Sequence, residues 1–204
     1  MKRWIQDISI RILDIFGAVL GIILSTIPIL IIAFLIKRED GGSVIFRQRR
    51  VGKNGSYFIM FKLRSMVEGS ENLWSRLIEH SDVEGMFKMH EDPRTTNIGK
   101  FIRKHSLDEL PQFWNILRGE MSLVGPRPAL IKEVESYDER SQRRLTVKPG
   151  ITGLWQVSGR SNLPFEKMID LDLEYIQRRT WWLNIIIMVK TILLIFPSEK
   201  NGAY

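Results

Sequence analysis

Residues 15–36 read IFGAVLGIILSTIPILIIAFLI, a stretch without a single charged side chain. As an α-helix it would measure roughly 33 Å, close to the roughly 30 Å thickness of the hydrocarbon core of a bilayer. Pro28 lies near its middle, where it removes a backbone donor and favours a bend. The stretch therefore predicts a membrane segment. A cleaved signal peptide is disfavoured, because the run is long and ends in the charged residues 37–40 without a small-residue cleavage pattern.

Positive charges flank this stretch on both sides, with Lys2, Arg3 and Arg11 before it and Lys37 and Arg38 after it. Basic residues favour the cytoplasmic side of a membrane. A single span should carry them mainly on one side, so these flanks indicate a segment that dips into the membrane and returns. A plain spanning helix with a tolerated proline kink is the alternative. These features alone do not separate the two.

The whole chain has 204 residues, enough for one domain and an attached segment. Its formal net charge of +7 suits an anionic partner, which could be a nucleic acid, a membrane surface or a phosphorylated substrate. No recognised nucleic-acid motif accompanies the charge, so we expect no nucleic-acid partner. Cysteine is absent and the three histidines show no tight metal spacing, which excludes disulfides and disfavours a zinc site.

After a break at residues 40–43, the pattern predicts an α+β fold that is mostly helical. The expected strands are residues 44–46 and 57–61, joined by a turn at 52–55, and an extended piece at 154–157. The expected helices cover residues 66–89, 98–104, 106–117, 129–144, 165–179 and 181–196. The last is either an interfacial helix, with Trp181 and Trp182 at headgroup level, or an ordinary core helix.

Two adjacent carboxylates occur in Ser106-Leu107-Asp108-Glu109-Leu110-Pro111-Gln112. Ser106 and Glu109 have the spacing of a capping box, which is the purely structural interpretation. Pro111 fits the fifth position of such a helix poorly, and a helix that starts with Pro111 in its first turn is the alternative. In both cases the acids lie near a helix N-terminus, where the dipole favours ionised carboxylates. Such a carboxylate can act as a nucleophile or bind a hard cation such as Mg²⁺.

Cationic side chains surround this pair in the sequence. Four of them are Lys62, Arg103, Arg127 and Arg160. Each alone is typical of a solvated surface. Arg127 differs because it stands between Pro126 and Pro128, in a loop whose rigidity suits bidentate phosphate recognition. The further run of Arg140, Arg143, Arg144 and Lys148 is interpreted as a membrane-facing or solvated surface.

Five strings occur in a fixed order along the chain. They are Phe61-Lys62-Leu63-Arg64-Ser65-Met66, Asp92-Pro93-Arg94, residues 106–112 as quoted above, Met121-Ser122-Leu123-Val124-Gly125-Pro126-Arg127-Pro128, and Lys148-Pro149-Gly150-Ile151-Thr152-Gly153-Leu154-Trp155-Gln156-Val157-Ser158-Gly159-Arg160. Together they resemble the bacterial sugar transferases, or monotopic polyprenyl-phosphate phosphoglycosyl transferases. The resemblance extends over nearly the whole chain.

This resemblance implies an enzyme at the cytoplasmic face of the bacterial inner membrane. Such enzymes convert a UDP-sugar and undecaprenyl phosphate to undecaprenyl-diphospho-sugar and UMP, which initiates surface glycan synthesis. Residues 1–40 would form a re-entrant membrane helix, and residues 41–204 a cytoplasmic catalytic domain with interfacial helices. Relatives often carry Ser-Pro at the helix break, whereas Ile27 precedes Pro28 here. The chain would correspond to the minimal catalytic form of the family. Whether it forms a homo-oligomer is left open by the resemblance.

By the same resemblance, Asp108 is the nucleophile that attacks the β-phosphorus of the donor, and Glu109 is its acidic partner. Mg²⁺ is expected at these two carboxylates. Lys62, Arg103, Arg127 and Arg160 match charged motif positions and are assigned to phosphate or nucleotide contacts. The ending Gly202-Ala203-Tyr204 resembles that of members that transfer hexose 1-phosphate, so galactose or glucose is expected. The rival interpretation is a membrane scaffold of a glycan-assembly complex, which would not need Asp108.

Overall fold

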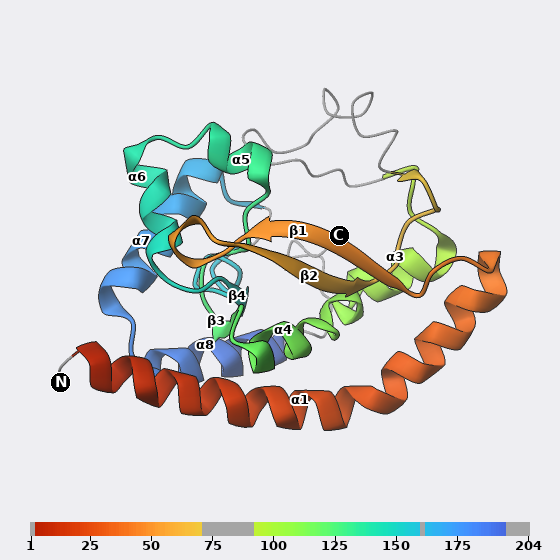
Figure 1. The fold of residues 1–204 in the computed structure, drawn as a ribbon, viewed down its shortest axis with the longest axis horizontal. Helices are drawn as coiled ribbons and strands as arrows, with labels where there is room; N and C mark the ends of the chain where they lie inside the picture. The colour runs from red at the N-terminus through yellow and green to blue at the C-terminus, as the bar shows by residue number, and fades with distance from the viewer. Residues whose placement is uncertain (1–2, 71–91, 160–161, 195–204) are drawn as a thin grey trace.

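The computed structural model describes residues 3–70, 92–159 and 162–194. Within these ranges the chain is mostly helical and has two small two-stranded sheets (Figure 1). The predicted α+β class is therefore confirmed. Arg160, the C-terminal Gly202-Ala203-Tyr204 and most of the predicted helix 66–89 lie outside the described residues. Of the residues of that prediction that can be checked, 66–69 are not helical, and Ser70 is in a 3₁₀ conformation.

The N-terminal helix α1 covers Arg3–Asp40 without interruption and contains Pro28. It is long and apolar enough to cross a membrane. Figure 1 shows that α1 bends in its second half and runs beneath the other elements. Pro28 explains a bend because its ring displaces the preceding turn. The Thr26 hydroxyl donates to the Ile22 carbonyl at 2.8 Å, a contact that also tends to bend helices.

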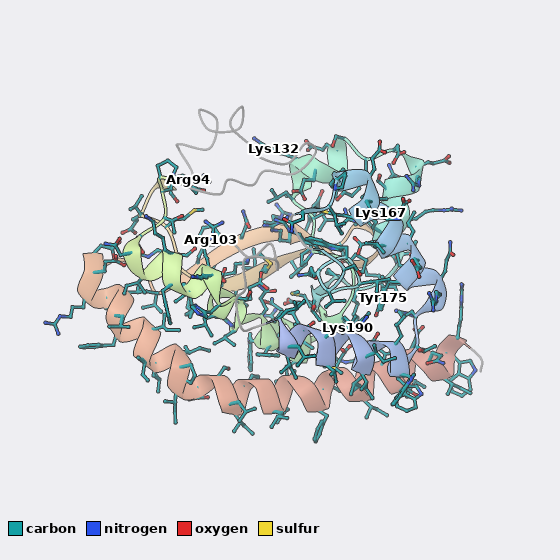
Figure 2. All side chains as sticks on the ribbon, turned by 180° about the vertical axis from the view of Figure 1, so that it is seen from behind. Arg94, Arg103, Lys132, Lys167, Tyr175 and Lys190 are labelled. Atoms are coloured by element: carbon teal, nitrogen blue, oxygen red, sulfur yellow. The ribbon has the colours of Figure 1, made fainter. Side chains whose placement is uncertain are left out.

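Helix α1 has two different faces. Its inner face buries Ile10, Ala18, Ile32 and Ile36 against the other elements. Its outer side chains project away from the rest of the molecule (Figure 2). They include Phe16 and Ile27, each 69% exposed. A continuous apolar surface of this kind indicates contact with a lipid or protein partner rather than water.

Two polar side chains fix α1 to the remaining fold. Arg11 donates to two backbone carbonyls in the last turn of helix α4 (Gln112–Arg118), at 2.7 and 2.9 Å. The buried Asp14 carboxylate accepts from a hydroxyl and from a backbone amide of strand β3 (Ser122–Val124), both at 2.8 Å. Arg11 thus satisfies carbonyls that a helix end leaves without partners.

The predicted hairpin is confirmed, and its strands are longer than expected. Strand β1 (Ile45–Val51) pairs antiparallel with β2 (Tyr57–Leu63) over their full lengths. The short helix η1 (Lys53–Gly55) forms the turn, with Asn54 at a φ of 55°. Asparagine is one of the few residues other than glycine that adopt this left-handed conformation readily.

The predicted helix 98–104 is confirmed as α3 (Asn97–Lys104). The single helix predicted over residues 106–117 is wrong. The chain instead forms a 3₁₀ turn, η4 (Leu107–Glu109), and α4 then begins after Pro111. Ser106 takes a left-handed φ of 56°, and its side chain makes no capping bond, so the capping box is wrong and the alternative start at Pro111 holds.

The helix predicted over residues 129–144 is also wrong, because the chain breaks there into three short pieces. These are α5 (Ile131–Glu135), α6 (Glu139–Gln142) and η5 (Arg143–Thr146). The break is stabilised by Asp138, whose carboxylate accepts from the Ser141 amide at 2.8 Å and caps α6. The extended piece predicted at 154–157 is a turn; the strand lies earlier, as β4 (Gly150–Thr152), parallel to β3.

The last two predicted helices are confirmed as α7 (Phe165–Arg178) and α8 (Trp181–Leu193). Helix α8 lies beside α1 (Figure 1). It buries Asn184 and Ile187 but exposes Trp182 and Ile192. The core alternative is therefore confirmed for one face of α8, and the interfacial position of its exposed apolar face stays a prediction.

One residue of the predicted basic surface is buried instead. Arg144 donates to Asp172 Oδ2 at 2.8 Å and to the Tyr137 hydroxyl at 2.6 Å. Asp172 is fully buried in α7. Burial raises the pKa of Asp172 to about 6 although Arg144 opposes the shift. This pair connects η5 to α7.

We expect Asp172→Ala to lower the free energy of unfolding by about 3–5 kcal/mol, because it leaves the buried Arg144 without its carboxylate. Asp170→Ala is the matched control. It removes the partner of Arg140 from an exposed ion pair on the same helix, which should cost at most about 1 kcal/mol. Denaturant unfolding followed by tryptophan fluorescence measures both. Equal losses would contradict the role assigned to the buried pair.

Candidate active site

A strained turn presents the two adjacent acids. The left-handed Ser106 starts η4, and the Glu109 amide donates to the Ser106 carbonyl at 3.3 Å. Asp108 is only 8% exposed, whereas the Glu109 side chain is more open. Backbone strain in a non-glycine residue is common at functional sites, where the surrounding structure holds it.

Lys62 joins the two carboxylates. Its Nζ lies 2.9 Å from Glu109 Oε1 and 3.5 Å from Asp108 Oδ2. Adjacent residues on a regular α-helix would point apart, but the tight turn lets both acids reach the same ammonium. The structure thus brings together three of the residues singled out in the sequence.

The position of Lys62 depends on a buried amide that the sequence did not reveal. Asn115 in α4 donates to the Ile59 carbonyl at 2.7 Å and accepts from the Phe61 amide at 3.1 Å. These bonds fix β2, the strand of Lys62, against the helix that follows the acids. Asn115 is fully buried.

The two carboxylates have different proton affinities. Burial raises the pKa of Asp108, and the neighbouring Glu109 adds to this rise while Lys62 opposes it. Burial would also raise the pKa of Glu109, but Lys62, Arg127 and Arg50 outweigh burial and hold it below its usual value. Glu109 is therefore the more firmly ionised acid, and Asp108 the more basic.

The loop of Arg127, residues 125–130, is held by backbone hydrogen bonds on both sides of Arg127. Its bonds join Gly125 N to Thr152 O (2.9 Å), Pro126 O to Gly150 N (2.9 Å), Pro128 O to Arg50 Nη1 (2.8 Å), Ala129 O to Val51 N (3.0 Å) and Leu130 N to Glu133 Oε2 (2.8 Å). Gly150 is required here, since a Cβ on it would lie 2.1 Å from the Gly125 nitrogen. The rigidity predicted for this loop is thus visible in its contacts.

Arg50 is a functional candidate that the sequence reasoning missed. Its guanidinium is buried, and it donates to the Pro128 carbonyl and to the Gln48 side chain, both neutral partners. Burial and the nearby Arg127 lower the pKa of Arg50 to about 9. Only the period-two alternation of β1, which puts Arg50 on the opposite face from the exposed Arg47 and Arg49, could have indicated it.

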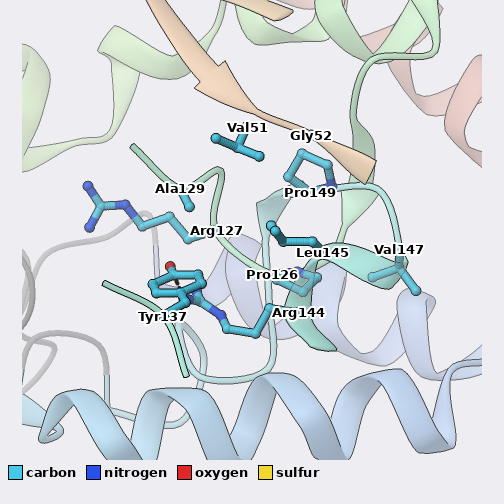
Figure 3. A pocket seen from close by; sticks show the side chains of 10 residues that line it. All are labelled: Val51, Gly52, Pro126, Arg127, Ala129, Tyr137, Arg144, Leu145, Val147 and Pro149. Carbon is cyan, nitrogen blue, oxygen red and sulfur yellow. Dashed lines mark hydrogen bonds between the residues drawn. The ribbon is translucent and has the colours of Figure 1, made fainter. Parts of the chain in front are cut away.

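A small cavity of about 10 Å³ is lined by residues of the Arg127 loop and by Tyr137 and Arg144. Figure 3 shows Tyr137 there between the side chains of Arg127 and Arg144. Arg144 bonds to both Asp172 and Tyr137, and it therefore connects the buried Asp172 to the cavity that Arg127 also lines. The cavity has room for about one water molecule.

A large cavity of about 740 Å³ contains the acids. Its charged lining consists of Arg50, Lys62, Arg103, Asp108, Glu109 and Arg127. Arg103 reaches it from α3 (Figure 2) and donates to Thr95 Oγ1 at 3.2 Å. Its apolar lining includes Leu20, Leu24 and Pro28 of α1, Phe113 of α4, and Met188 and Ile192 of α8. One cavity therefore combines a cationic, carboxylate-bearing site with the apolar helix α1.

The donor set for a metal is small. Among the described residues, no group of three or more histidine or acidic side chains could hold an ion. Asp108 and Glu109 supply two carboxylates, which fits Mg²⁺ bound by one or two carboxylates together with substrate phosphates. It does not fit a metal held by the protein alone.

Comparisons with known proteins agree with this chemistry. Residues 5–198 match the model of a family described as bacterial sugar transferase. The chain is 48% identical over 187 residues to a galactosyl transferase of Streptococcus agalactiae and 40% identical over 199 residues to an undecaprenyl-phosphate galactose phosphotransferase of Salmonella typhimurium. These alignments cover 91% and 95% of this chain but only 41% of each relative. An exopolysaccharide production protein of Sinorhizobium fredii is 38% identical, over 99% of this chain and 91% of its own length.

The electrostatic coupling of the acids can be measured directly. Glu109→Gln removes a charge that raises the Asp108 pKa, so we expect this pKa to fall. Lys62→Met removes a charge that lowers the Asp108 pKa, so this pKa should rise. Lys62→Arg keeps the charge and should change the Asp108 pKa little. Carbon-13 NMR titration of labelled aspartate carboxyls measures these values, with Asp108→Asn to identify the signal. An Asp108 titration that is the same in all variants would disprove the coupling.

Proposed function

Since this chain belongs to the bacterial sugar transferase family, we propose that it is an undecaprenyl-phosphate sugar phosphotransferase. It moves a sugar 1-phosphate from a UDP-sugar to undecaprenyl phosphate and releases UMP, the step that initiates a surface glycan. The supporting relatives include proteins named for galactose transfer. Hexose, and galactose in particular, is therefore the proposed sugar.

The observation that carries this proposal is the composition of the large cavity. Phosphoryl transfer needs little covalent chemistry from a protein beyond a nucleophile, fixed cations and correct positioning. The cavity offers two carboxylates beside Lys62, with Arg50, Arg103 and Arg127 in the same lining. The apolar residues of α1 and α8 in that lining suit an acceptor whose phosphate is attached to a long hydrocarbon chain.

In the proposed first step, a carboxylate oxygen of Asp108 attacks the β-phosphorus of the UDP-sugar. The bond from this phosphorus to the bridging oxygen breaks, UMP leaves with that oxygen, and an aspartyl phosphate ester of the sugar remains. In the second step, an oxygen of the lipid phosphate attacks the same phosphorus. The bond to Asp108 breaks, and the carboxylate is regenerated. The higher basicity of Asp108 favours it as the nucleophile.

The other residues hold charge in this scheme. Lys62 and the rigidly based Arg127 bind the phosphate oxygens, and Arg103 and Arg50 add positive potential. Arg160, whose role follows from the family motif alone, is proposed for the nucleotide. Glu109 keeps Lys62 in place and, with Asp108, would hold Mg²⁺ on the donor diphosphate. When bound, this ion would neutralise the charge that develops on the departing UMP.

The two ends of α1 support a re-entrant position in the membrane. Near its start, Asp7 forms an ion pair with Arg179, and at its end Asp40 pairs with Arg64. Both partners belong to the same folded unit. A straight spanning helix would place its ends on opposite sides of the bilayer. We therefore propose that α1 enters and leaves at the cytoplasmic face of the inner membrane, bent at Pro28.

We expect Asp108→Asn to reduce UMP release by about 10³-fold or more, as is usual when a nucleophile is removed. Incubation of the unchanged protein with UDP-galactose and Mg²⁺, without lipid, should add one sugar phosphate to Asp108, detected by mass spectrometry. The exposed Asp170→Asn should behave as the unchanged protein. A membrane scaffold would predict that Asp108→Asn keeps its cellular function. A ternary complex without an adduct would favour direct transfer.

Removal of Mg²⁺ should abolish turnover, and readdition should restore it. Because the protein supplies only two carboxylates, we expect weak Mg²⁺ binding to the free protein and tighter binding once a UDP-sugar is present. Isothermal titration of the unchanged protein with and without UDP, which carries the diphosphate but no sugar to transfer, compares the two conditions, and Glu109→Gln is the control that lacks one carboxylate. Equally tight binding without the nucleotide would contradict the shared coordination.

A further inference from the structure

Three residues that line the large cavity each carry a buried polar atom without a hydrogen-bond partner. The atoms are Gln112 Nε2, Trp155 Nε1 and Gln156 Oε1. Gln112 is 2% exposed and Trp155 is 6% exposed. Leaving one such atom unpaired costs about 1–3 kcal/mol, and folded proteins rarely do so. Three in the lining of one cavity indicate that a ligand supplies the missing partners.

The three side chains come from two segments that already belong to the site. Gln112 is the first residue of α4, one turn after Asp108 and Glu109. Trp155 and Gln156 lie in the turn that follows β4, and β4 holds the Arg127 loop. The Gln156 amide nitrogen donates to the Ile151 carbonyl at 3.4 Å. This contact directs one end of the side chain to the backbone and leaves the oxygen without a partner.

The chemistry of these atoms differs from that of the phosphate-binding residues. The cavity's cations can each pair with phosphate oxygens. Gln112 and Trp155 instead offer uncharged donors, and Gln156 offers an uncharged acceptor. The other unpaired buried atoms, in Glu133, Asp172 and Asn184, belong to residues outside the described lining of this cavity. A hydroxyl group both donates and accepts, so a set with both kinds of atom suits a polyhydroxy compound.

We propose that Gln112, Trp155 and Gln156 form a neutral subsite that binds the hydroxyl groups of the transferred sugar. This inference rests on the proposed function, because it places the sugar of the UDP-sugar donor in the same cavity as Asp108. The cations bind the diphosphate, and the neutral subsite distinguishes one hexose from another. A pocket built to hydrogen-bond a hydroxyl rejects compounds that lack it, because its own polar atoms then stay unpaired.

The test uses the full-length protein in detergent or nanodiscs, with UMP release as the assay. Gln112→Met and Gln156→Met keep the side-chain length and remove the polar atoms, and Trp155→Phe removes the indole N–H together with part of the ring. We expect each to lower kcat/KM for UDP-galactose about tenfold, the effect of one lost hydrogen bond. The inhibition constant of UMP, which carries the nucleoside but no sugar, should stay within about twofold. Gln177→Met, on the exposed face of α7, is the control and should change neither value.

A series of UDP-deoxygalactoses completes the test. For the unchanged protein, kcat/KM should be about tenfold lower with at least one deoxy donor than with UDP-galactose. One of the three variants should show the same kcat/KM with that deoxy donor as with UDP-galactose, because the hydrogen bond is already lost, as in a double-mutant cycle. If the loss from the variant and the loss from the deoxy donor simply add, the proposal is overturned. Weaker inhibition by UMP in the variants would also overturn it, because it would place the nucleoside in this subsite. If the unchanged protein releases no UMP from any UDP-sugar, the proposed function fails, and the subsite fails with it.

Discussion

The attachment of α1 is the constraint on which the rest of the structure depends. If α1 lies in a membrane as proposed, apolar surface alone gives little drive for other elements to pack on it, so directional polar contacts are needed. Arg11 and Asp14 supply them, to α4 and to β3. Helix α4 begins directly after the acidic pair, and β3 leads directly into the Arg127 loop. The elements that hold the apolar helix are therefore the same elements that set the geometry of the site.

Local signals in the sequence were enough where a segment's own pattern decides its structure. The helices at 98–104 and 165–179 and the hairpin around residues 52–55 follow from periodicity and turn chemistry. Prediction failed where a distant partner decides. Arg144 is buried because Asp172, 28 residues later, receives it, and no local pattern contains this fact. At Ser106 the local signals conflicted: the capping-box spacing was wrong, and the start at Pro111 was the correct alternative.

The candidate site divides in the same way. Asp108, Glu109 and Lys62 were expected near one another from the ordered motifs, and they meet in the structure. Asn115 and Arg50 were not expected. An asparagine inside a short helix resembles an ordinary surface residue, and the alternation along β1 was the one local signal for Arg50. The approach of β1, β2 and α4 shows that both side chains are buried. The three unpaired atoms of the neutral subsite are likewise a property of packing that composition does not reveal.

The crowding of Arg50 beside Arg127 has a consequence for the lifetime of the protein. Burial of the Arg50 guanidinium first, and repulsion from the nearby Arg127 second, raise the free energy of the folded state, as the lowered pKa of Arg50 reflects. An anion that binds only the folded form relieves this repulsion and stabilises it in proportion to RT ln(1 + [L]/Kd). The idle protein is thus the form most open to unfolding and proteolysis. If the proposed function holds, the phosphorylated substrates are such anions, and their supply sets how much of the protein is in the more stable form.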